Sequence, residues 1–219
     1  MAKSQHLAGK TTSAQRMREA THQRREQQKQ ELYQEILAAA AELFLEQGYE
    51  RFSLRQVAER IGYAAGTIYL YFKDKDEVLY KLTQDFYTRF DQQQELARKS
   101  ESEPLARIRA MGRAYVDFGI NNPVAYQLMF TQRPELLTQI IKDANEPSEG
   151  EEPGLLLEEV RCGMQIGVVR QGDPTAIADA LWASVHGIVA FSLPLHDQER
   201  AEKMADTALQ ILIDGLKPR

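Results

Sequence analysis

The 219-residue sequence is poor in the residue types that build disulfides, metal sites and secretory signals. Its single cysteine, Cys162, cannot form an intrachain disulfide, which is typical of a reducing compartment. The four histidines are too scattered along the chain to form a metal-binding motif: His6, His22, His186 and His196. No apolar run approaches the ~18–20 residues that cross a bilayer, and the N-terminus lacks the apolar region of a secretory signal. We therefore expect a cytoplasmic protein with no membrane partner and no metal.

Sequence patterns for catalysis and cofactor binding are also missing. Neither of the glycine-rich phosphate-binding patterns, GxGxxG and GxxxxGK[ST], occurs in the sequence. Nothing at motif level supports Cys162 and His186 as a nucleophilic pair, and a structural thiol is the simpler interpretation of Cys162. The sequence therefore predicts no enzyme activity and no cofactor.

Acidic charge is not spread evenly along the chain. The net charge is −5, but residues 1–75 carry 12 basic and 9 acidic side chains, whereas residues 76–219 carry 15 and 23. Residues 1–30 alone hold 7 basic and 2 acidic side chains. Attraction to phosphate falls off over about 8–10 Å, so the sign of the binding end matters more than the total. The N-terminal third is therefore compatible with a nucleic-acid partner.

Residues 52–75 read as two short helices joined by a tight turn. The first helix has an apolar face with the spacing i, i+3, i+4 and i+7, formed by Leu54, Val57, Ala58 and Ile61. Ser53 is its expected N-cap and Gly62 its expected end. The second helix is expected at 65–72. This pattern is typical of a helix-turn-helix, whose second helix enters the major groove of DNA.

The second helix of this pair is expected to have one buried face and one small, mostly uncharged face. Ile68 and Phe72 point one way, and the opposite face carries Gly66, Thr67 and Leu70. Thr can hydrogen-bond a base edge and an apolar side chain can contact a thymine methyl. The flanking side chains, Tyr69 and Tyr71, suit phosphate oxygens. On the residues alone, core packing is the favoured role for these two tyrosines, because partly buried tyrosine is common.

The same stretch carries a family resemblance. GYAAGTIYLYFKDKDEVL resembles the recognition helix and following turn of the TetR family of transcriptional regulators, and ELYQEILAAAAELFLEQGYERFSLRQVAERIG resembles its first two helices. The resemblance covers about Arg24 to Leu82. It implies a base contact for Arg55, recognition positions for Thr67, Leu70 and Tyr71, and phosphate contacts for Tyr69 and Lys75. The DNA-binding set is therefore Ser53, Arg55, Gly66, Thr67, Tyr69, Leu70, Tyr71 and Lys75.

The N-terminal domain is expected to have three helices preceded by an extension. The first helix is predicted from about Arg24 to Gln47, with Gly48 ending it. Residues 1–23 are polar and basic, and two interpretations remain open. They form either a flexible solvated tail or a basic arm that follows DNA, with contacts from Arg16, Arg18, Arg24 and Arg25. Most TetR-family sequences begin close to the first helix, so this extension departs from the family pattern.

Residues 74–219 show repeated helical patterns with a Pro/Gly/Glu-rich loop at 145–154. The last two helices are expected at about 174–193 and 197–216, with Asp173 as an N-cap and Pro174 in the first turn. The stretch 181–191 is apolar nearly all round, as expected of a helix buried between its own body and a partner. With residues 115–130, it resembles the C-terminal domain of a TetR subgroup marked by Trp-x-x-x-His-Gly, here Trp182, His186 and Gly187.

This C-terminal part is expected to bind an effector and to form a homodimer through its last two helices. Aromatic and apolar side chains at helical spacing line either a core or a cavity, and the pattern does not separate the two. The candidate pocket residues are Phe86, Phe90, Tyr115, Phe118, Tyr126, Met129, Phe130, Trp182 and His186.

The sequence thus predicts an all-α protein with an extension at 1–23, a helix-turn-helix domain at 24–73 and an effector-binding and dimerisation domain at 74–219. The predicted function is a ligand-responsive regulator, a homodimeric repressor that a small apolar molecule releases from a palindromic operator in double-stranded DNA. The alternative is a constitutive DNA-binding or architectural protein without an effector.

Overall fold

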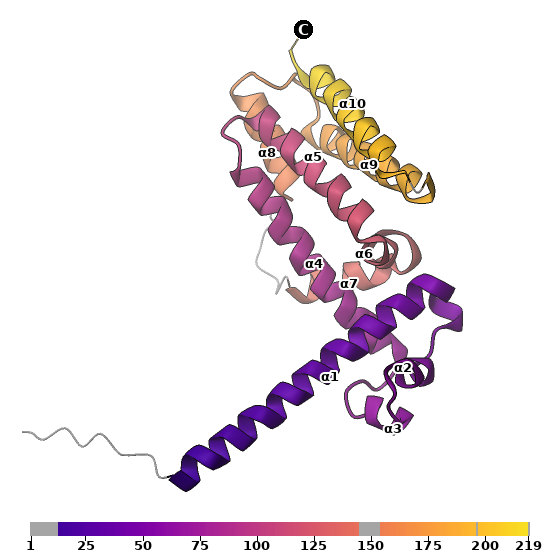
Figure 1. Cartoon of the computed structure of the whole chain (residues 1–219). Coiled ribbons are helices and arrows are strands. Elements are labelled where there is room, and N and C mark those ends of the chain that lie inside the picture. The colour runs from indigo at the N-terminus through magenta and orange to yellow at the C-terminus, as the bar shows by residue number, and fades with distance from the viewer. Residues whose placement is uncertain (1–12, 145–153, 196, 219) are drawn as a thin grey trace, which may run out of the picture. The chain divides into compact units, whose positions relative to one another are not determined.

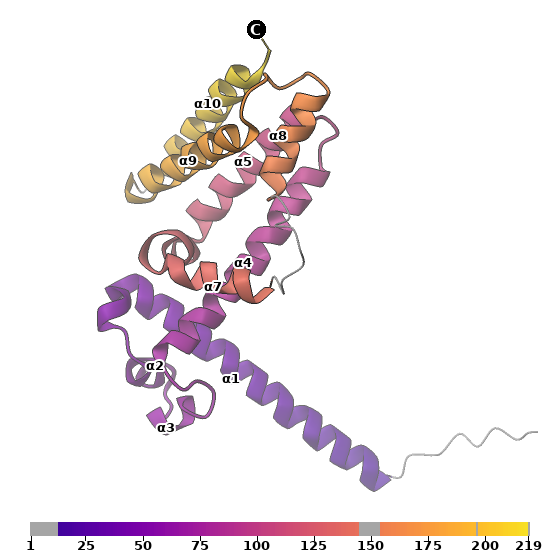
Figure 2. The same cartoon turned by 180° about the vertical axis from the view of Figure 1, so that it is seen from behind.

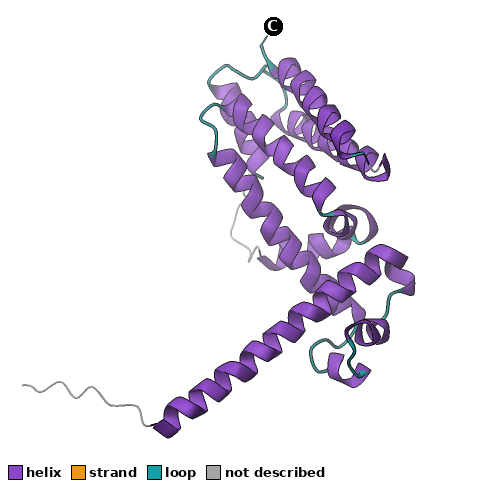
Figure 3. Cartoon of the chain, in the orientation of Figure 1, coloured by secondary structure: helices purple, strands orange, loops and turns teal. Residues whose placement is uncertain are grey.

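A computed structural model describes residues 13–144, 154–195 and 197–218 of the chain. Figures 1 and 3 show that the described elements are helices, which confirms the predicted all-α class. The chain divides into two compact units, Met1–Lys75 and Asp76–Arg219. Most of the loop predicted at 145–154, and residues 1–12 of the predicted extension, lie outside the described residues.

The first unit contains three helices, α1 (Ser13–Arg51), α2 (Leu54–Ile61) and α3 (Ala65–Ile68). Helix α1 begins upstream of the predicted start at Arg24, so residues 13–23 of the expected flexible extension are helical. Its regular geometry is broken where predicted, because Gly48 has a φ of 73° and a ψ of 175°. Positive φ is readily adopted by glycine, so the sequence marks this break directly.

Helix α2 begins and ends as its sequence predicts. The Ser53 side chain accepts a hydrogen bond from the Gln56 amide, and Gly62 closes the helix in the left-handed conformation with a φ of 74°. The core under these helices consists of fully buried side chains, among them Ile36, Phe44, Phe52, Val57, Ile68 and Phe72. Caps and apolar periodicity therefore fix the helix-turn-helix locally.

Helix α3 is shorter than the predicted 65–72. It ends at Ile68, and the following residues form tight turns. The Leu70 amide donates to the Thr67 carbonyl at 3.2 Å and the Tyr71 amide to the Ile68 carbonyl at 2.9 Å. These i to i+3 bonds are characteristic of a tightened final turn. The prediction was therefore wrong about the regularity of residues 69–72, although Ile68 and Phe72 are both buried as expected.

The second unit is a bundle in which α5 (Pro104–Asn121) packs against α8 (Leu155–Gln165), α9 (Pro174–Ser192) and α10 (Gln198–Leu216). Helix α4 (Lys75–Lys99) leads into it, and between α5 and α8 lie α6 (Pro123–Tyr126), the π-helical turn η1 (Gln127–Gln132) and α7 (Pro134–Ala144). A short 3-10 turn, η2 (Leu193–Leu195), follows α9. Figure 2 shows α9 and α10 side by side, as in Figure 1.

Helix α9 begins as predicted, because the Asp173 side chain accepts from the Thr175 amide at 2.9 Å and Pro174 follows directly. The segment Pro174–Leu195 is long and apolar enough, by length and composition alone, to cross a membrane. This finding corrects the expectation that no apolar run approaches that length. The core helix of a soluble protein passes the same test, and Leu181, Val185 and Val189 of α9 are buried against its own bundle.

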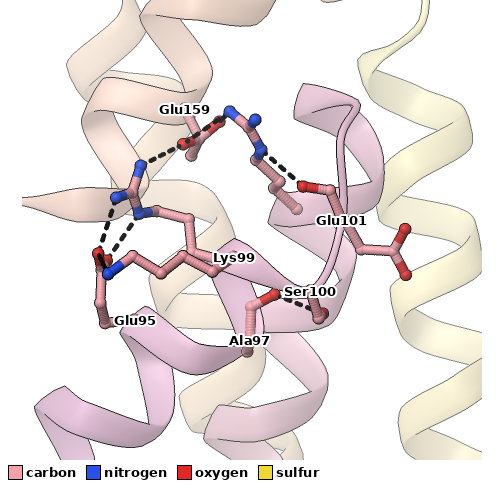
Figure 4. Close-up of polar contacts among 8 residues, drawn as sticks. Glu95, Ala97, Lys99, Ser100, Glu101 and Glu159 are labelled. Carbon is pink, nitrogen blue, oxygen red and sulfur yellow. Dashed lines mark hydrogen bonds and ion pairs between the residues drawn. The ribbon is translucent and has the colours of Figure 1, made fainter.

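A buried carboxylate ties three helices of this unit together. Glu159 of α8 is 3% exposed and receives Arg98 of α4 at 3.2 Å and Arg107 of α5 at 3.3 Å. Figure 4 shows its carboxylate between the two guanidinium groups. Arg98 also makes two hydrogen bonds to Glu95, at 2.7 and 2.9 Å, and Arg107 donates to the Glu101 carbonyl at 3.0 Å.

Candidate DNA-binding surface and effector cavity

The segment from Gly66 to Tyr71 is anchored by one buried side chain and exposes most of its others to solvent. Ile68 is fully buried, whereas Leu70 is 84% exposed and Tyr69 is 56% exposed. Gly66 is exposed, and Thr67 and Tyr71 are partly exposed. The exposure of Tyr69 argues against its assignment to the core. The segment therefore forms a thin, uncharged ridge on the first unit.

The other predicted DNA-binding residues have distinct local surroundings. Arg55 is exposed on α2. Ser53 serves the helix itself, because its hydroxyl donates to Gln56 Oε1 at 2.9 Å while capping α2. The Lys75 ammonium donates to the Tyr49 carbonyl at 2.9 Å and lies 3.8 Å from the centre of the Tyr49 ring. Lys75 is therefore held at the start of α4 by its own unit.

Helix α2 is held to α1 by a charged contact that the sequence pattern did not reveal. Arg60 Nη1 and Nη2 each lie 2.7 Å from a carboxylate oxygen of Glu46, and Nη1 lies 3.5 Å from Glu42. The hydrogen bond from Arg60 lowers the pKa of Glu46. Because these side chains are largely exposed, the contact orients α2 more than it stabilises the fold.

The second unit contains a partly open cavity of about 380 Å³ among α4, α5, η1, α7, α8, α9 and α10. Five of the nine predicted pocket residues line it: Phe90, Tyr115, Met129, Phe130 and Trp182. The walls are completed mainly by aliphatic side chains, including Ile108, Met111, Leu137, Leu156, Leu181 and Leu212. The volume lies in the usual range for a small-molecule site, about 300–1,000 Å³.

The remaining four predicted pocket residues, Phe86, Phe118, Tyr126 and His186, do not line the cavity. The Phe118 ring packs edge-on against Phe90 at 5.2 Å, which places it behind the wall. The Tyr126 hydroxyl donates to the His186 carbonyl at 3.2 Å. Phe86 is buried on α4 and its ring lies 4.9 Å from the guanidinium of Arg89.

Tyr115 and His186 form a partly buried polar contact behind the aromatic wall. The Tyr115 hydroxyl lies 2.6 Å from His186 Nδ1. Burial raises the pKa of the Tyr115 phenol and lowers the pKa of His186. Both shifts favour the neutral forms, so at neutral pH this contact joins two uncharged groups. His186 therefore orients Tyr115, whose ring lines the cavity.

Two family models match the chain. The model described as "Bacterial regulatory proteins, tetR family" matches residues 36–81, and "Tetracyclin repressor-like, C-terminal domain" matches residues 108–216. The chain belongs to the TetR family. As a member of it, the chain is a DNA-binding transcriptional regulator and not an enzyme.

One curated relative and two solved structures match this TetR-family chain over nearly their whole length. It is 26% identical over 193 residues to the fatty acid metabolism regulator protein of Bacillus subtilis (strain 168), which covers 86% of this chain and 97% of the relative. A solved structure of FadR from Bacillus subtilis in complex with stearoyl-CoA superposes with a TM-score of 0.69 and 20% identity, covering 84% and 99% of the two chains. PfmR from Thermus thermophilus gives a TM-score of 0.67 and 24% identity, covering 83% and 98%. These two structures support the TetR fold.

Several polar residues line the cavity of this TetR-family chain although the sequence pattern did not indicate them. They are Asp91, Gln94 and Asp179, together with Tyr87. No lysine or arginine is among the described residues that line the cavity. Polar residues of this kind carry no periodic signal, because they lie at the edges of helical faces that only the folded bundle brings together.

The described residues also contain no group of three or more metal-ligating side chains.

Proposed function

We propose that this TetR-family protein is a homodimeric cytoplasmic repressor, which an apolar small molecule releases from a palindromic operator. The observation that carries the proposal is the presence, in one chain, of an exposed uncharged ridge on a helix-turn-helix and a separate apolar cavity. A constitutive DNA-binding protein needs only the ridge. The cavity therefore favours the ligand-responsive function over the architectural alternative.

The ridge supports the proposed division of DNA contacts. Thr67, Leu70 and Tyr71 would meet base edges, since small and apolar groups approach them closely. Arg55 would add a base contact from α2, and Tyr69 and Lys75 would contact phosphates. Two such ridges in a dimer would occupy half-sites about 34–36 Å apart, one helical turn of DNA.

Exposed apolar side chains on α9 and α10 support a dimer through these helices. Phe191 of α9 is 57% exposed and Ile211 of α10 is 67% exposed. A second copy of the chain, rather than a membrane, would then cover the exposed apolar side chains of α9 and α10. Replacing Ile211 with Asp should produce a monomer in size-exclusion chromatography with light scattering, and an unchanged dimer would contradict this interface.

The composition of the cavity supports an effector with an apolar body. The charged side chains in its lining are acidic, Asp91 and Asp179, so an anionic group inside it would meet repulsion and no cation. A fatty acyl thioester of coenzyme A fits if the acyl chain enters and the phosphates remain outside. The stearoyl-CoA complex of the related FadR structure supports this class. We also propose that the chain belongs to the Trp-x-x-x-His-Gly subgroup. In support, Trp182 and His186 pack edge to face with ring centres 5.2 Å apart.

Release from DNA is proposed to act through α4. Phe90, Asp91 and Gln94 of this helix line the cavity, and the helix begins at Lys75, a proposed phosphate contact. By linkage, the effector must bind the DNA-free form more tightly, with a typical coupling of about 1–3 kcal/mol. Tenfold release from the operator needs about 1.4 kcal/mol.

The test compares stearoyl-CoA with coenzyme A alone, using the DNA fragment that the purified protein selects from its genome. Stearoyl-CoA at about 100 times its Kd should stabilise the protein by about 2.7 kcal/mol and weaken DNA binding, whereas coenzyme A should do neither. Stabilisation without DNA release would contradict the coupling. DNA binding that no acyl thioester affects, together with no stabilisation, would favour the constitutive alternative.

A further inference from the structure

The outer part of α1 is exposed on all sides. Every side chain from Arg16 to Glu31 is exposed, and Figures 1 and 2 show this part of the helix extending clear of α2 and α3. Met17 is its only large apolar side chain and is 71% exposed. Without an apolar stripe, this helix cannot dock on a hydrophobic groove or on a second copy of itself. A partner that covers it must therefore be polar or charged.

The charges of this helix are sorted by face. Helical geometry places Arg18, His22, Arg25 and Lys29 on one face, because their spacing is i, i+4, i+7 and i+11. We call these four residues the basic stripe. At about 100° per residue, Arg16 and Arg24 lie on the opposite side. The acidic residues Glu19 and Glu26 lie about a quarter-turn to the side of Arg18 and Arg25, respectively.

The basic stripe faces the same side as the helix-turn-helix. Arg18 and Ile36 are 18 residues apart, which is five complete turns of an α-helix, and the same spacing joins Arg25 to Leu43. Ile36 and Leu43 point into the core of the first unit and are at most 5% exposed. The stripe therefore continues, along α1, the face that carries the buried Ile36 and Leu43 of the first unit.

The inner end of the stripe lies beside the DNA-reading segment. Tyr33 is one turn from Lys29 along α1, and its ring stacks on Phe72 with centres 5.1 Å apart. Phe72 directly follows the exposed ridge that ends at Tyr71. Cations on the stripe are thus placed next to the surface proposed to enter the major groove.

We propose that the basic stripe binds the sugar–phosphate backbone of the duplex that flanks each operator half-site. This inference rests on the proposed DNA-binding function. The stripe is about 17 Å long at 1.5 Å per residue, which is the axial length of about five base-pair steps at 3.4 Å each. Backbone contacts carry no sequence information, so the stripe extends the footprint and raises affinity while α3 selects the sequence. Arg16 and Arg24 take no part.

The test uses the full-length protein and two charge-matched variants of the same helix, R18Q/R25Q on the stripe and R16Q/R24Q on the opposite side. Glutamine retains a good helix propensity, and circular dichroism checks that α1 persists. The probe is the fragment that the wild-type protein selects from its genome, either trimmed to its central palindrome or extended by about one helical turn, ~10 base pairs, on each side.

R18Q/R25Q removes four phosphate contacts per dimer. On the extended fragment, the negative slope of log K against log salt should therefore become shallower by about 3.6. At about 50 mM salt the same variant should bind this fragment at least tenfold more weakly and lose hydroxyl-radical protection at both outer edges. On the trimmed fragment it should bind as the wild-type protein does. R16Q/R24Q should keep the slope and the footprint.

Equal losses of affinity and salt dependence in the two variants would show a general charge effect and would overturn the proposed role of the stripe. Unchanged footprints in both variants would overturn it as well and point to a protein partner for this helix. A wild-type protein that selects no DNA fragment at all would instead overturn the proposed function, so the two failures are distinguishable.

Discussion

Glu159 offers a sharp test of how the second unit is stabilised, because its burial differs strongly from that of its partners. Its side chain is 3% exposed, whereas those of Arg98 and Arg107 are 26% and 30% exposed. Removing both arginines leaves a buried carboxylate without a compensating charge, which typically costs about 3–5 kcal/mol. We therefore expect R98A/R107A to lower the free energy of unfolding by about that amount.

Neutralising the carboxylate should cost less. In E159Q the guanidinium of Arg98 keeps its two hydrogen bonds to Glu95, and Arg107 keeps the Glu101 carbonyl and access to water. A weakened pair of charge-assisted hydrogen bonds then accounts for a loss of about 1–2 kcal/mol. Adding E159Q to R98A/R107A should raise stability above that of the double variant, since it removes the unpaired buried charge.

The assay is urea unfolding followed by tryptophan fluorescence at fixed protein concentration. Trp182 is the only tryptophan of the sequence and lies on α9, so the signal reports the second unit. E95Q is the matched control, because it also removes a carboxylate that contacts Arg98, but one that is 30% exposed. A loss in E159Q as large as that in R98A/R107A, or no recovery in the triple variant, would refute the reasoning from burial.

Three further predictions concern other parts of the chain. A Cβ on Gly119 would lie 2.6 Å from Val189 Cγ1, so G119A should lower the free energy of unfolding by about 1–3 kcal/mol, as measured by the same urea assay. A Cβ on Gly66 meets nothing within 4 Å, so G66A should leave stability unchanged while weakening operator binding in an anisotropy titration, and undiminished binding would remove Gly66 from the DNA surface. Hydrogen bonds from Arg98 and Lys99 hold the pKa of Glu95 at about 2, below its ordinary 4.5, so its contribution is complete above pH 4.5 and is lost as the pH falls towards 2. E95Q should therefore flatten the acid limb of the stability profile in that window, and an unchanged limb would contradict this ion pair.

The helix-turn-helix was largely predictable because its signals are local. Ser53 and Gly62 bound α2 through the cap geometry that their residue types favour, and Gly48 marks the break in α1. The length of α3 was not predictable in the same way. Residues 69–71 keep the apolar spacing of a helix while their hydrogen bonds tighten, so periodicity alone overestimates the regular segment.

The cavity was only partly predictable, because a helical pattern marks which face points inward but not what lies there. Phe90 and Phe118 occupy inward faces of different helices, yet Phe90 lines the cavity and Phe118 packs behind it. The buried Glu159 was missed for the same reason. A glutamate in a helical pattern is usually solvated, and its two arginine partners are distant in sequence.

The π-helical turn η1 has a consequence for how the cavity of such a protein can evolve. Met129 and Phe130 both line the cavity and both belong to the π-helical turn Gln127–Gln132. The hydrogen bonds of a π-helix span one residue more than those of an α-helix. Deleting a single residue there restores α-helical register locally and swings one of the two side chains out of the wall. A one-codon deletion at this turn should therefore change which ligands the cavity accepts, while the backbone hydrogen bonds of α6 before it and of α7 after it remain.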